Sequence, residues 1–433
     1  MPKRVAIIGA GFGGTMTAVQ LAKRGIDVTL IGRAPQVGMG VAYSTEDPAH
    51  LLNIPAVKMG AWPDAPGDFA DATGADPEAY VPRMLFGRYL RDILEASAVT
   101  VIEGEAIGIE PGWTVRLGDG SRIAAEAVVL APGNQSPDAL PFARDLPEHL
   151  FAADPWGQAG RAVIAKAVAS GGDVLVVGSG LSMIDVAMSL DAAGYCGKLV
   201  AVSRRGQMPR IQLETMSQVP SSDDAPSGSL RALSRWVRQR SGAIEWRDVV
   251  DSVRPRTHEL WASLSLDDQR RFMRHARPWW DVHRHRIAPK AGAIVERMMA
   301  EGRMEVLGGR VQSLVEADGA IDAIIRQRGA AKNDPVRRFA VGINCTGPLH
   351  AIARTRDPVL RSLLDAGLAE PDALGIGINV DDGVRVIGAD RMWAMGSLGK
   401  ARYWEIIAVP DIRVQAVEVA NAIAMELNDV VQP

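Results

Sequence analysis

The chain repeats one local pattern twice, and this repeat limits the folds open to it. The first copy is "RVAIIGAGFGGTMTAVQLAKRGIDVTLIGR" (residues 4–33), and the second is "DVLVVGSGLSMIDVAMSLDAAGYCGKLVAVSRRG" (residues 173–206). Each copy reads as an apolar strand, a glycine turn, a helix and a second apolar strand, which is a βαβ unit of a parallel sheet. The sequence therefore predicts an α/β protein with two related nucleotide-binding halves.

The likeness between the halves continues beyond these units. In the first half, an alternating β stretch at residues 99–112 precedes the apolar "AEAVVLAPGN" at residues 125–134. In the second half, residues 304–319 precede "FAVGINCTGP" at residues 339–348. Each half therefore ends on an apolar strand that runs into a glycine, as expected of two Rossmann-like domains.

A helical and loop insertion, residues 212–303, separates the second unit from its closing strand. Its first part, "QLETMSQVPSSDDAPSGS" (residues 212–229), is polar and rich in Pro and Ser, which predicts a loop or a mobile lid. Residues 230–303 have a mostly helical pattern, and residues 404–427 read as a loop followed by a helix.

The composition excludes several classes of function. The 433 residues carry a formal net charge of −3, which gives no reason to expect nucleic acid or a membrane surface as a partner. The two cysteines, Cys196 and Cys345, form no CxxC motif, which argues against a dithiol redox centre and a structural zinc site. No secretory signal or membrane-spanning run is apparent, so we expect a soluble cytoplasmic protein. The oligomeric state cannot be predicted.

The first glycine turn has the spacing of a dinucleotide site. Gly9, Gly11 and Gly14 form G-x-G-x-x-G between a strand and a helix. The first glycine permits a tight turn, the second lets a pyrophosphate approach the backbone, and the third lets helix and strand pack closely. The alternative is a glycine turn with a purely structural role.

The second turn repeats Gly178 and Gly180, but Met183 occupies the third glycine position. Arg204 and Arg205 follow at the end of the next strand, where arginine can pair bidentately with a ribose 2′-phosphate. This favours NADPH, with NADH possible, over the alternative of a solvated basic strand end. The residues predicted to bind NADP are Gly178, Ser179, Gly180, Ser182, Ser203, Arg204 and Arg205.

Two dinucleotide folds in one chain suggest a flavin enzyme that takes hydride from a nicotinamide. Four further blocks occur in order: "GMGVAYSTEDPAHLLNIPAVKM" (residues 38–59), "VVGSGLSMIDV" (176–186), "RPWWDVHRHRIAP" (277–289) and "YWEIIAVPDIRVQA" (403–416). Together they resemble the FAD/NAD(P)-binding protein family that includes FAD-dependent urate hydroxylase and the nitrosuccinate-forming aspartate N-monooxygenase.

The resemblance implies a glutathione-reductase-like two-domain flavoprotein. Residues 1–165 and 346–433 would form the FAD-binding domain, and residues 166–345 the NAD(P)-binding domain with its insertion. Trp404 and Asn53 have alternative readings as an ordinary core residue and a turn cap. The residues implied in FAD binding are Gly9, Gly11, Gly13, Gly14, Arg33, Gly40, Tyr43, Leu52, Asn53, Met59, Gly133, Gly396, Trp404 and Glu405.

One position departs from the family pattern. Related proteins usually carry Glu where this chain has Gly32, and that carboxylate accepts hydrogen bonds from ribose hydroxyls. We expect FAD to bind with a weaker adenosine contact, with Arg33 stacking on adenine or reaching phosphate. One lost charge-assisted hydrogen-bond pair is worth roughly 1.5–3 kcal/mol, so Gly32→Glu is expected to tighten FAD binding.

The insertion concentrates basic and aromatic residues. A metal site is disfavoured because no carboxylate cluster completes a ligand set, and we expect no metal. A nucleic-acid patch is disfavoured by the overall acidity. A basic lining for an anionic or urea-like substrate, or for NADPH phosphates, competes with a structural role at the domain interface. The substrate-pocket candidates are Trp279, His283, His285 and Arg286.

The sequence leads to a single-component flavin monooxygenase. It would use NAD(P)H and O₂ to hydroxylate a small polar nitrogen-containing substrate through a flavin C4a-(hydro)peroxide. Urate-type ring hydroxylation and amino N-hydroxylation both remain open, and the compact length favours the first. The alternatives are an NAD(P)H-dependent flavin reductase or oxidase and a non-catalytic nucleotide sensor.

Overall fold

The computed structural model describes residues 4–213 and 219–429. Its first sheet is parallel throughout, and its central strands are short apolar segments that are buried on both faces. Such strands read as continuous apolar runs, which is why the repeat was visible in the sequence. In spatial order, the strands are β15 (Met392–Ala394), β7 (Ala127–Leu130), β1 (Arg4–Ile8), β2 (Asp27–Gly32) and β3 (Thr100–Glu103).

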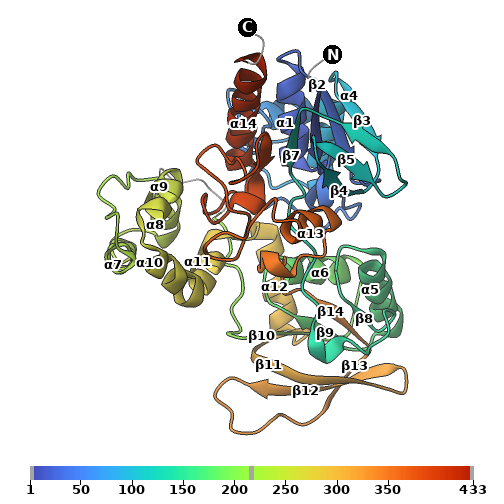
Figure 1. The fold of residues 1–433 in the computed structure, drawn as a ribbon. Coiled ribbons are helices and arrows are strands. Elements are labelled where there is room, and N and C mark those ends of the chain that lie inside the picture. Colours follow the sequence, from blue (N-terminus) through green and yellow to red (C-terminus); the bar gives the residue numbers. More distant parts are fainter. Residues whose placement is uncertain (1–3, 214–218, 430–433) are drawn as a thin grey trace.

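Helices from both ends of the chain cover this first sheet (Figure 1). Helix α1 (Phe12–Ala22) packs against the C-terminal helix α14 (Val409–Asp429) and against α4 (Arg83–Glu95). The shorter helices are α2 (Gly40–Tyr43), η1 (Ala56–Lys58), α3 (Asp68–Thr73), η5 (Ile352–Arg354), α13 (Pro358–Asp365) and η6 (Gly396–Gly399). A small antiparallel sheet consists of β4 (Ala106–Glu110), β5 (Thr114–Leu117) and β6 (Arg122–Ala124).

The second sheet extends a parallel core with an antiparallel edge. Its strands are, in spatial order, β13 (Arg337–Phe339), β12 (Ala320–Gln327), β11 (Met304–Ala317), β10 (Leu199–Ser203), β9 (Val174–Val177), β14 (Val341–Asn344) and β8 (Phe151–Ala152). Helices α5 (Gln158–Ser170), α6 (Leu181–Ala192) and α12 (Pro289–Ala300) pack on it, and η2 (Pro141–Ala143) lies near β11. The predicted domain boundary at residue 165 falls inside α5.

The helical insertion lies to one side of both sheets in Figure 1, between β10 and α12 in the chain. Its elements are α7 (Leu230–Ser241), α8 (Trp246–Val253), η3 (Arg254–Arg256), α9 (Thr257–Ser263), α10 (Leu266–Arg271), the π-helical turn η4 (Phe272–Ala276) and α11 (Arg277–Arg284). Because α12 packs on α6 and β11, it is the crossover helix that joins two parallel strands rather than part of the inserted body.

Two connectors join the insertion to the second domain, and they run side by side. Ile211 forms a parallel bridge with Ile287. The Ile287 amide donates to the Arg210 carbonyl at 2.9 Å, and the Gln212 amide donates to the Ile287 carbonyl at 2.9 Å. The outgoing and returning chains therefore form a narrow two-stranded ribbon.

Among residues 4–213 and 219–429, no helix is both long enough and apolar enough to span a membrane.

Candidate functional site

The first glycine turn is built so closely that side chains are excluded at two of its positions. Gly9 has a φ of +109°, and a Cβ there would lie 2.2 Å from the Ala131 carbonyl oxygen. A Cβ on Gly14 would lie 1.9 Å from the Gly9 carbonyl oxygen. These contacts hold strand β1, the start of α1 and the end of β7 together. The turn therefore presents the N-terminal amides of an eleven-residue helix to the carboxyl edge of the sheet.

The backbone around this turn faces open space at several glycines. A Cβ on Gly11 would meet only the Gly40 Cα, at 3.6 Å, and nothing lies within 4 Å of a Cβ built on Gly133 or Gly396. The last two segments are joined, because the Ser397 hydroxyl donates to the Gly133 carbonyl at 2.7 Å. The Gly396 amide, in turn, is held by the Gln415 side chain at 2.8 Å. A cradle lined by backbone from three distant segments fits the pyrophosphate and sugar of a dinucleotide.

The other residues predicted to lie along a flavin differ in exposure. Leu52 and Met59 are buried in the core of the first domain, whereas Asn53 is half-buried. Tyr43 packs edge-on against Phe86, and burial raises the pKa of its phenol to about 12. Gly13 lies on the helix face that contacts Ile412 and Met395. FAD would therefore meet backbone and apolar surface here more than charged side chains.

Gly32 is a packing position as well as a missing carboxylate. A Cβ at Gly32 would lie 2.4 Å from the Ala10 Cβ and 3.3 Å from a Val37 methyl group. The next residue, Arg33, is exposed and pairs with Glu105 at 3.4 Å, on the solvent side of the sheet edge. This contact argues against the expectation that Gly32→Glu tightens FAD binding, because the Cβ cannot enter without moving Ala10.

We expect Gly32→Glu to lower flavin retention, and Ala10→Gly combined with Gly32→Glu to raise it above that of the single variant. The double variant removes the Cβ that blocks the new side chain, so the carboxylate can accept hydrogen bonds from the ribose hydroxyls. This is expected to raise the affinity for FAD by about ten- to a hundredfold. Flavin titration by fluorescence measures both, with Ala10→Gly alone as control. Equal affinity of the single and double variants would contradict this account.

Trp404 and Glu405 face the helical insertion. The indole of Trp404 stacks on Trp261 with ring centres 4.8 Å apart, and its Nε1 has no partner among the described residues. The buried Glu405 carboxylate accepts from Arg284 Nε at 2.8 Å and from Trp280 Nε1, and its backbone φ is +70°. These contacts attach α11 to the chain segment between η6 and α14. The carboxylate is thus already engaged by the protein.

The second glycine turn has the same close backbone contact as the first. A Cβ on Gly178 would lie 2.1 Å from the Cys345 carbonyl oxygen, and nothing lies within 4 Å of one built on Gly180. Met183 is fully buried in the core of this domain. The turn is therefore open at Gly180, where α6 begins, despite the bulk of Met183.

Two of the three serines predicted to bind NADP already have internal partners. The Ser179 hydroxyl bonds to Ser203 Oγ at 2.7 Å and donates to the Gln207 carbonyl at 2.5 Å. The Ser203 hydroxyl also accepts the Gly206 amide at 3.0 Å. These bonds close the loop that carries the two arginines. Ser182 is half-buried on the first turn of α6.

Arg204 and Arg205 differ in their surroundings. Arg204 is exposed, whereas Arg205 is half-buried and its Nη1 is buried with no partner among the described residues. The Arg205 backbone lies against Gly308 of the neighbouring strand β11. Arg204 is therefore the residue of the pair that is free to reach a ligand beyond the end of β10.

The insertion candidates do not converge on one point. Trp279 is 53% exposed, and His283 bonds to the Trp279 carbonyl and lies edge-on to Trp246. His285 lies 3.8 Å from Glu405, and burial lowers the pKa of its imidazole to about 4. Arg286 is buried and paired with Asp251, with one unpartnered guanidinium nitrogen. Among residues 4–213 and 219–429, no group of His, Cys, Asp and Glu could hold a metal ion.

A polar contact between the two domains was missed by sequence reasoning. Arg83, at the start of α4, pairs with the buried Asp185 of α6 at 3.0 Å. His50 bonds through Nε2 to Ser189 at 2.9 Å, and Ser189 donates to Asp47 at 2.5 Å. The segment predicted to line the flavin is thus tied to the helix that follows the second glycine turn. The acid within "SMIDV" was the available signal, because a carboxylate on a buried helix face needs a partner.

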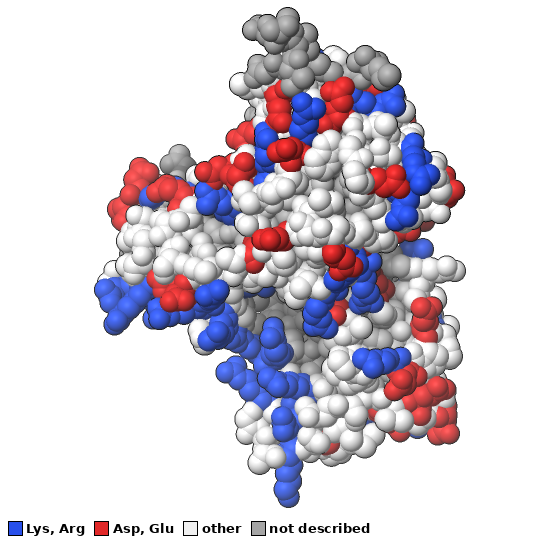
Figure 2. All heavy atoms as spheres, viewed as in Figure 1, with Lys and Arg blue, Asp and Glu red and all other residues white. Residues whose placement is uncertain are grey.

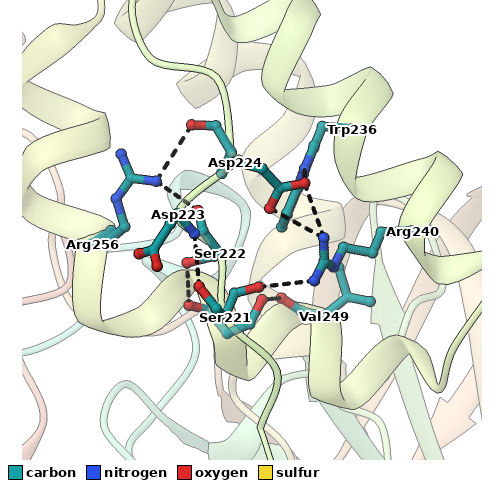
Figure 3. A network of polar contacts seen from close by, with 10 residues as sticks. Ser221, Ser222, Asp223, Asp224, Trp236, Arg240, Val249 and Arg256 are labelled. Carbon is teal, nitrogen blue, oxygen red and sulfur yellow. Dashed lines mark hydrogen bonds and ion pairs between the residues drawn. The ribbon is translucent and has the colours of Figure 1, made fainter.

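Part of the predicted lid is held firmly against the insertion. Residues 214–218 lie outside the described residues, and residues 221–224 are anchored as Figure 3 shows. Asp224 accepts from Trp236 Nε1 at 3.0 Å and pairs with Arg240 at 3.0 Å. Arg256 donates to the Ser222 carbonyl at 2.6 Å. Residues 221–225 would therefore move only together with helices α7 to α9.

The fold and the two turns define a class of protein, that of two-domain proteins with a dinucleotide cradle at the parallel strands of each sheet. Residues 6–135 match the model of a family described as FAD-NAD(P)-binding. This match supports the predicted resemblance in the first domain. No curated protein matches the chain.

Solved structures share the fold over nearly the whole length. An ornithine N-hydroxylase from Kutzneria sp. 744, with reduced FAD, NADP⁺ and L-ornithine, has a TM-score of 0.67 and 14% identity, with 98% of this chain and 99% of that chain covered. An L-lysine 6-monooxygenase from Pseudomonas syringae has a TM-score of 0.66 and 15% identity, with 99% of each chain covered. A thioredoxin reductase from T. acidophilum has a TM-score of 0.57 and 12% identity, with 98% of each covered. These likenesses confirm the predicted fold class, a two-domain flavoprotein fold.

Proposed function

We propose that this chain is an FAD-dependent, NAD(P)H-consuming monooxygenase that hydroxylates the nitrogen of a small amine. The observation that carries the proposal is the pair of open glycine cradles on two sheets, each formed by backbone that excludes a Cβ. The likeness to ornithine and lysine hydroxylases favours an amine substrate over the urate-type ring that the chain length suggested. The thioredoxin reductase likeness carries less weight, because Cys196 is exposed, Cys345 is buried and no CxxC motif exists.

The residues present fit FAD in the first domain. The amides at the start of α1 would meet its pyrophosphate, and the Gly133 and Gly396 backbones would lie along its sugar chain. Bound flavin would supply the reaction with O₂, which no side chain of the protein can carry out. The protein's own part is to bind, orient and exclude water.

The second domain would hold the nicotinamide dinucleotide. Gly180 opens the turn at the start of α6, and Arg204 lies beyond the end of β10, where a ribose 2′-phosphate is recognised in such folds. The Arg83–Asp185 pair would keep this turn in a constant position relative to the first domain. The helical insertion would cover the space between the two cofactors.

The function is tested on the purified full chain. We expect flavin absorbance near 450 nm, NADPH oxidation that an amine accelerates, and a hydroxylamine product with little peroxide. Amines such as ornithine, lysine and aspartate, with urate as the ring alternative, form the first panel. Peroxide release that no compound in a broad amine panel reduces would contradict the proposal and favour an NAD(P)H oxidase.

A further inference from the structure

Lys and Arg side chains gather around a hollow between the helical insertion and the second domain, as Figure 2 shows. The hollow lies beside the carboxyl ends of the strands in the second sheet. Strand β9 has β10 on one side and β14 on the other, so the chain leaves β9 at the point where the strand order reverses. Ligands of open α/β sheets bind in the crevice outside such a point.

Arg204 directly follows β10, and His350 lies in the segment that follows β14, on the other side of β9 in the sheet order. The α11 residue Arg277 reaches across from the insertion and donates through Nη2 to His350 Nε2 at 2.9 Å. Burial, with the charges of Arg277, Lys400 and Arg204, lowers the pKa of His350 to about 3. His350 is therefore a neutral acceptor that orients the Arg277 guanidinium.

Lys400 brings a third cation to the same group from the first domain. Lys400 directly follows η6, and within the described parts of the chain its ammonium forms no hydrogen bond or ion pair. Burial, and to a lesser extent the charge of Arg277, lowers the pKa of Lys400 to about 8, while Asp372 opposes this shift.

Two acidic groups lie near these cations, and one of them is already paired with Arg277. Asp281 pairs with Arg277 at 3.2 Å, and burial raises the pKa of its carboxyl to about 6. The Asp372 carboxylate faces Lys400 but accepts the backbone amides of Leu374, Ile376 and Gly377. Among residues 4–213 and 219–429, Lys400 and Arg204 form no ion pair with a carboxylate, although the Asp372 charge acts on Lys400.

We propose that Arg204, Arg277 and Lys400 form one anion-binding site for the phosphate groups of a nicotinamide dinucleotide. This proposal rests on the proposed function and goes beyond it in two respects. The site takes one cation from each of the second domain, the insertion and the first domain, so the dinucleotide joins all three. Because the Lys400 ammonium must be charged to contribute, affinity for the dinucleotide falls as the pH rises through the pKa of Lys400.

The test is the binding of NADP⁺ and NAD⁺ to the flavin-loaded full chain by calorimetry between pH 6.5 and 9.5. Loss of one hydrogen bond to a charged group corresponds to about ten- to a hundredfold in affinity. We expect this loss for Lys400→Met and Arg277→Met at pH 7. Lys400→Arg should retain the affinity and make it independent of pH. Arg402→Gln is the matched control, because Arg402 is exposed and pairs with Asp382.

The outcomes show which phosphate group binds at the site, and they distinguish failure of this proposal from failure of the proposed function. A loss seen with NADP⁺ alone assigns the 2′-phosphate, whereas an equal loss with NAD⁺ assigns the pyrophosphate, and both support the site. Unchanged Kd values for Lys400→Met and Arg277→Met would overturn it, even if amine hydroxylation persists. A wild-type protein that binds neither dinucleotide would overturn both proposals. A correct site with no hydroxylamine product would overturn only the proposed function.

Discussion

Gly14→Ala is expected to yield a protein that no longer retains flavin. The added Cβ would lie 1.9 Å from the Gly9 carbonyl oxygen, and neither atom can turn aside, because the backbone fixes the position of both. Relief requires α1 to move away from β1, which displaces the helix amides that would face the pyrophosphate. The measurement is flavin per protein after gel filtration, with circular dichroism to check that the sheets remain folded.

Gly13→Ala is the matched control for this variant. Its Cβ would meet only the ends of the Ile412 and Met395 side chains, at 3.2 Å and 3.3 Å, and these can adjust. We expect Gly13→Ala to keep most of its flavin. If Gly14→Ala retained flavin as well as Gly13→Ala does, the close approach of helix and strand would not be needed for the cofactor.

Glu405→Gln is expected to lower the free energy of unfolding by about 3–5 kcal/mol, the cost of leaving a buried charge without its partner. The side chains of Glu405 and Arg284 are 5% and 9% exposed, so solvent cannot replace the lost carboxylate. Glu405 also keeps α11 against the first domain, and loosening this contact would expose Trp280. Urea denaturation of the full chain, followed by tryptophan fluorescence, measures the change.

Asp382→Asn provides the comparison, because its ion pair with Arg402 is largely exposed, at 79% and 47%. Exposed pairs contribute about 0–1 kcal/mol, so this variant should unfold almost as the wild type does. Combining Glu405→Gln with Arg284→Met removes both charges and should recover part of the loss. Equal stabilities of Glu405→Gln and Asp382→Asn would show that the buried pair does not hold the insertion.

The strands and glycine turns could be predicted because their signals are local. Apolar runs that end in Gly9 or Gly178 specify strand, turn and helix within about thirty residues. The crossover helix α12 was assigned to the insertion because its pattern does not differ from that of its neighbours. The strand on which a helix packs depends on tertiary contacts, and a local sequence pattern does not reveal these.

The contacts between segments could not be predicted from the sequence. Glu405 was expected beside a flavin, yet its carboxylate is bound by Arg284, which lies more than one hundred residues away in the chain. Gly32 was read as a lost acceptor, and only the structure shows that Ala10 blocks a side chain there. His350 gave no signal, because it belongs to no motif and its contact with Arg277 depends on how the insertion docks on the rest of the chain.

The paired connectors at Ile211 and Ile287 have a mechanical consequence. The insertion is covalently part of the second domain, but Trp261, Trp280 and Arg284 fasten it to the first. If the second domain rotated relative to the first, the insertion would remain with the first domain. The bending would then concentrate in the ribbon where the two connectors share hydrogen bonds. The two connectors would therefore act as a hinge between the second domain and the insertion. Cleavage of either connector would leave the insertion bound to the first domain.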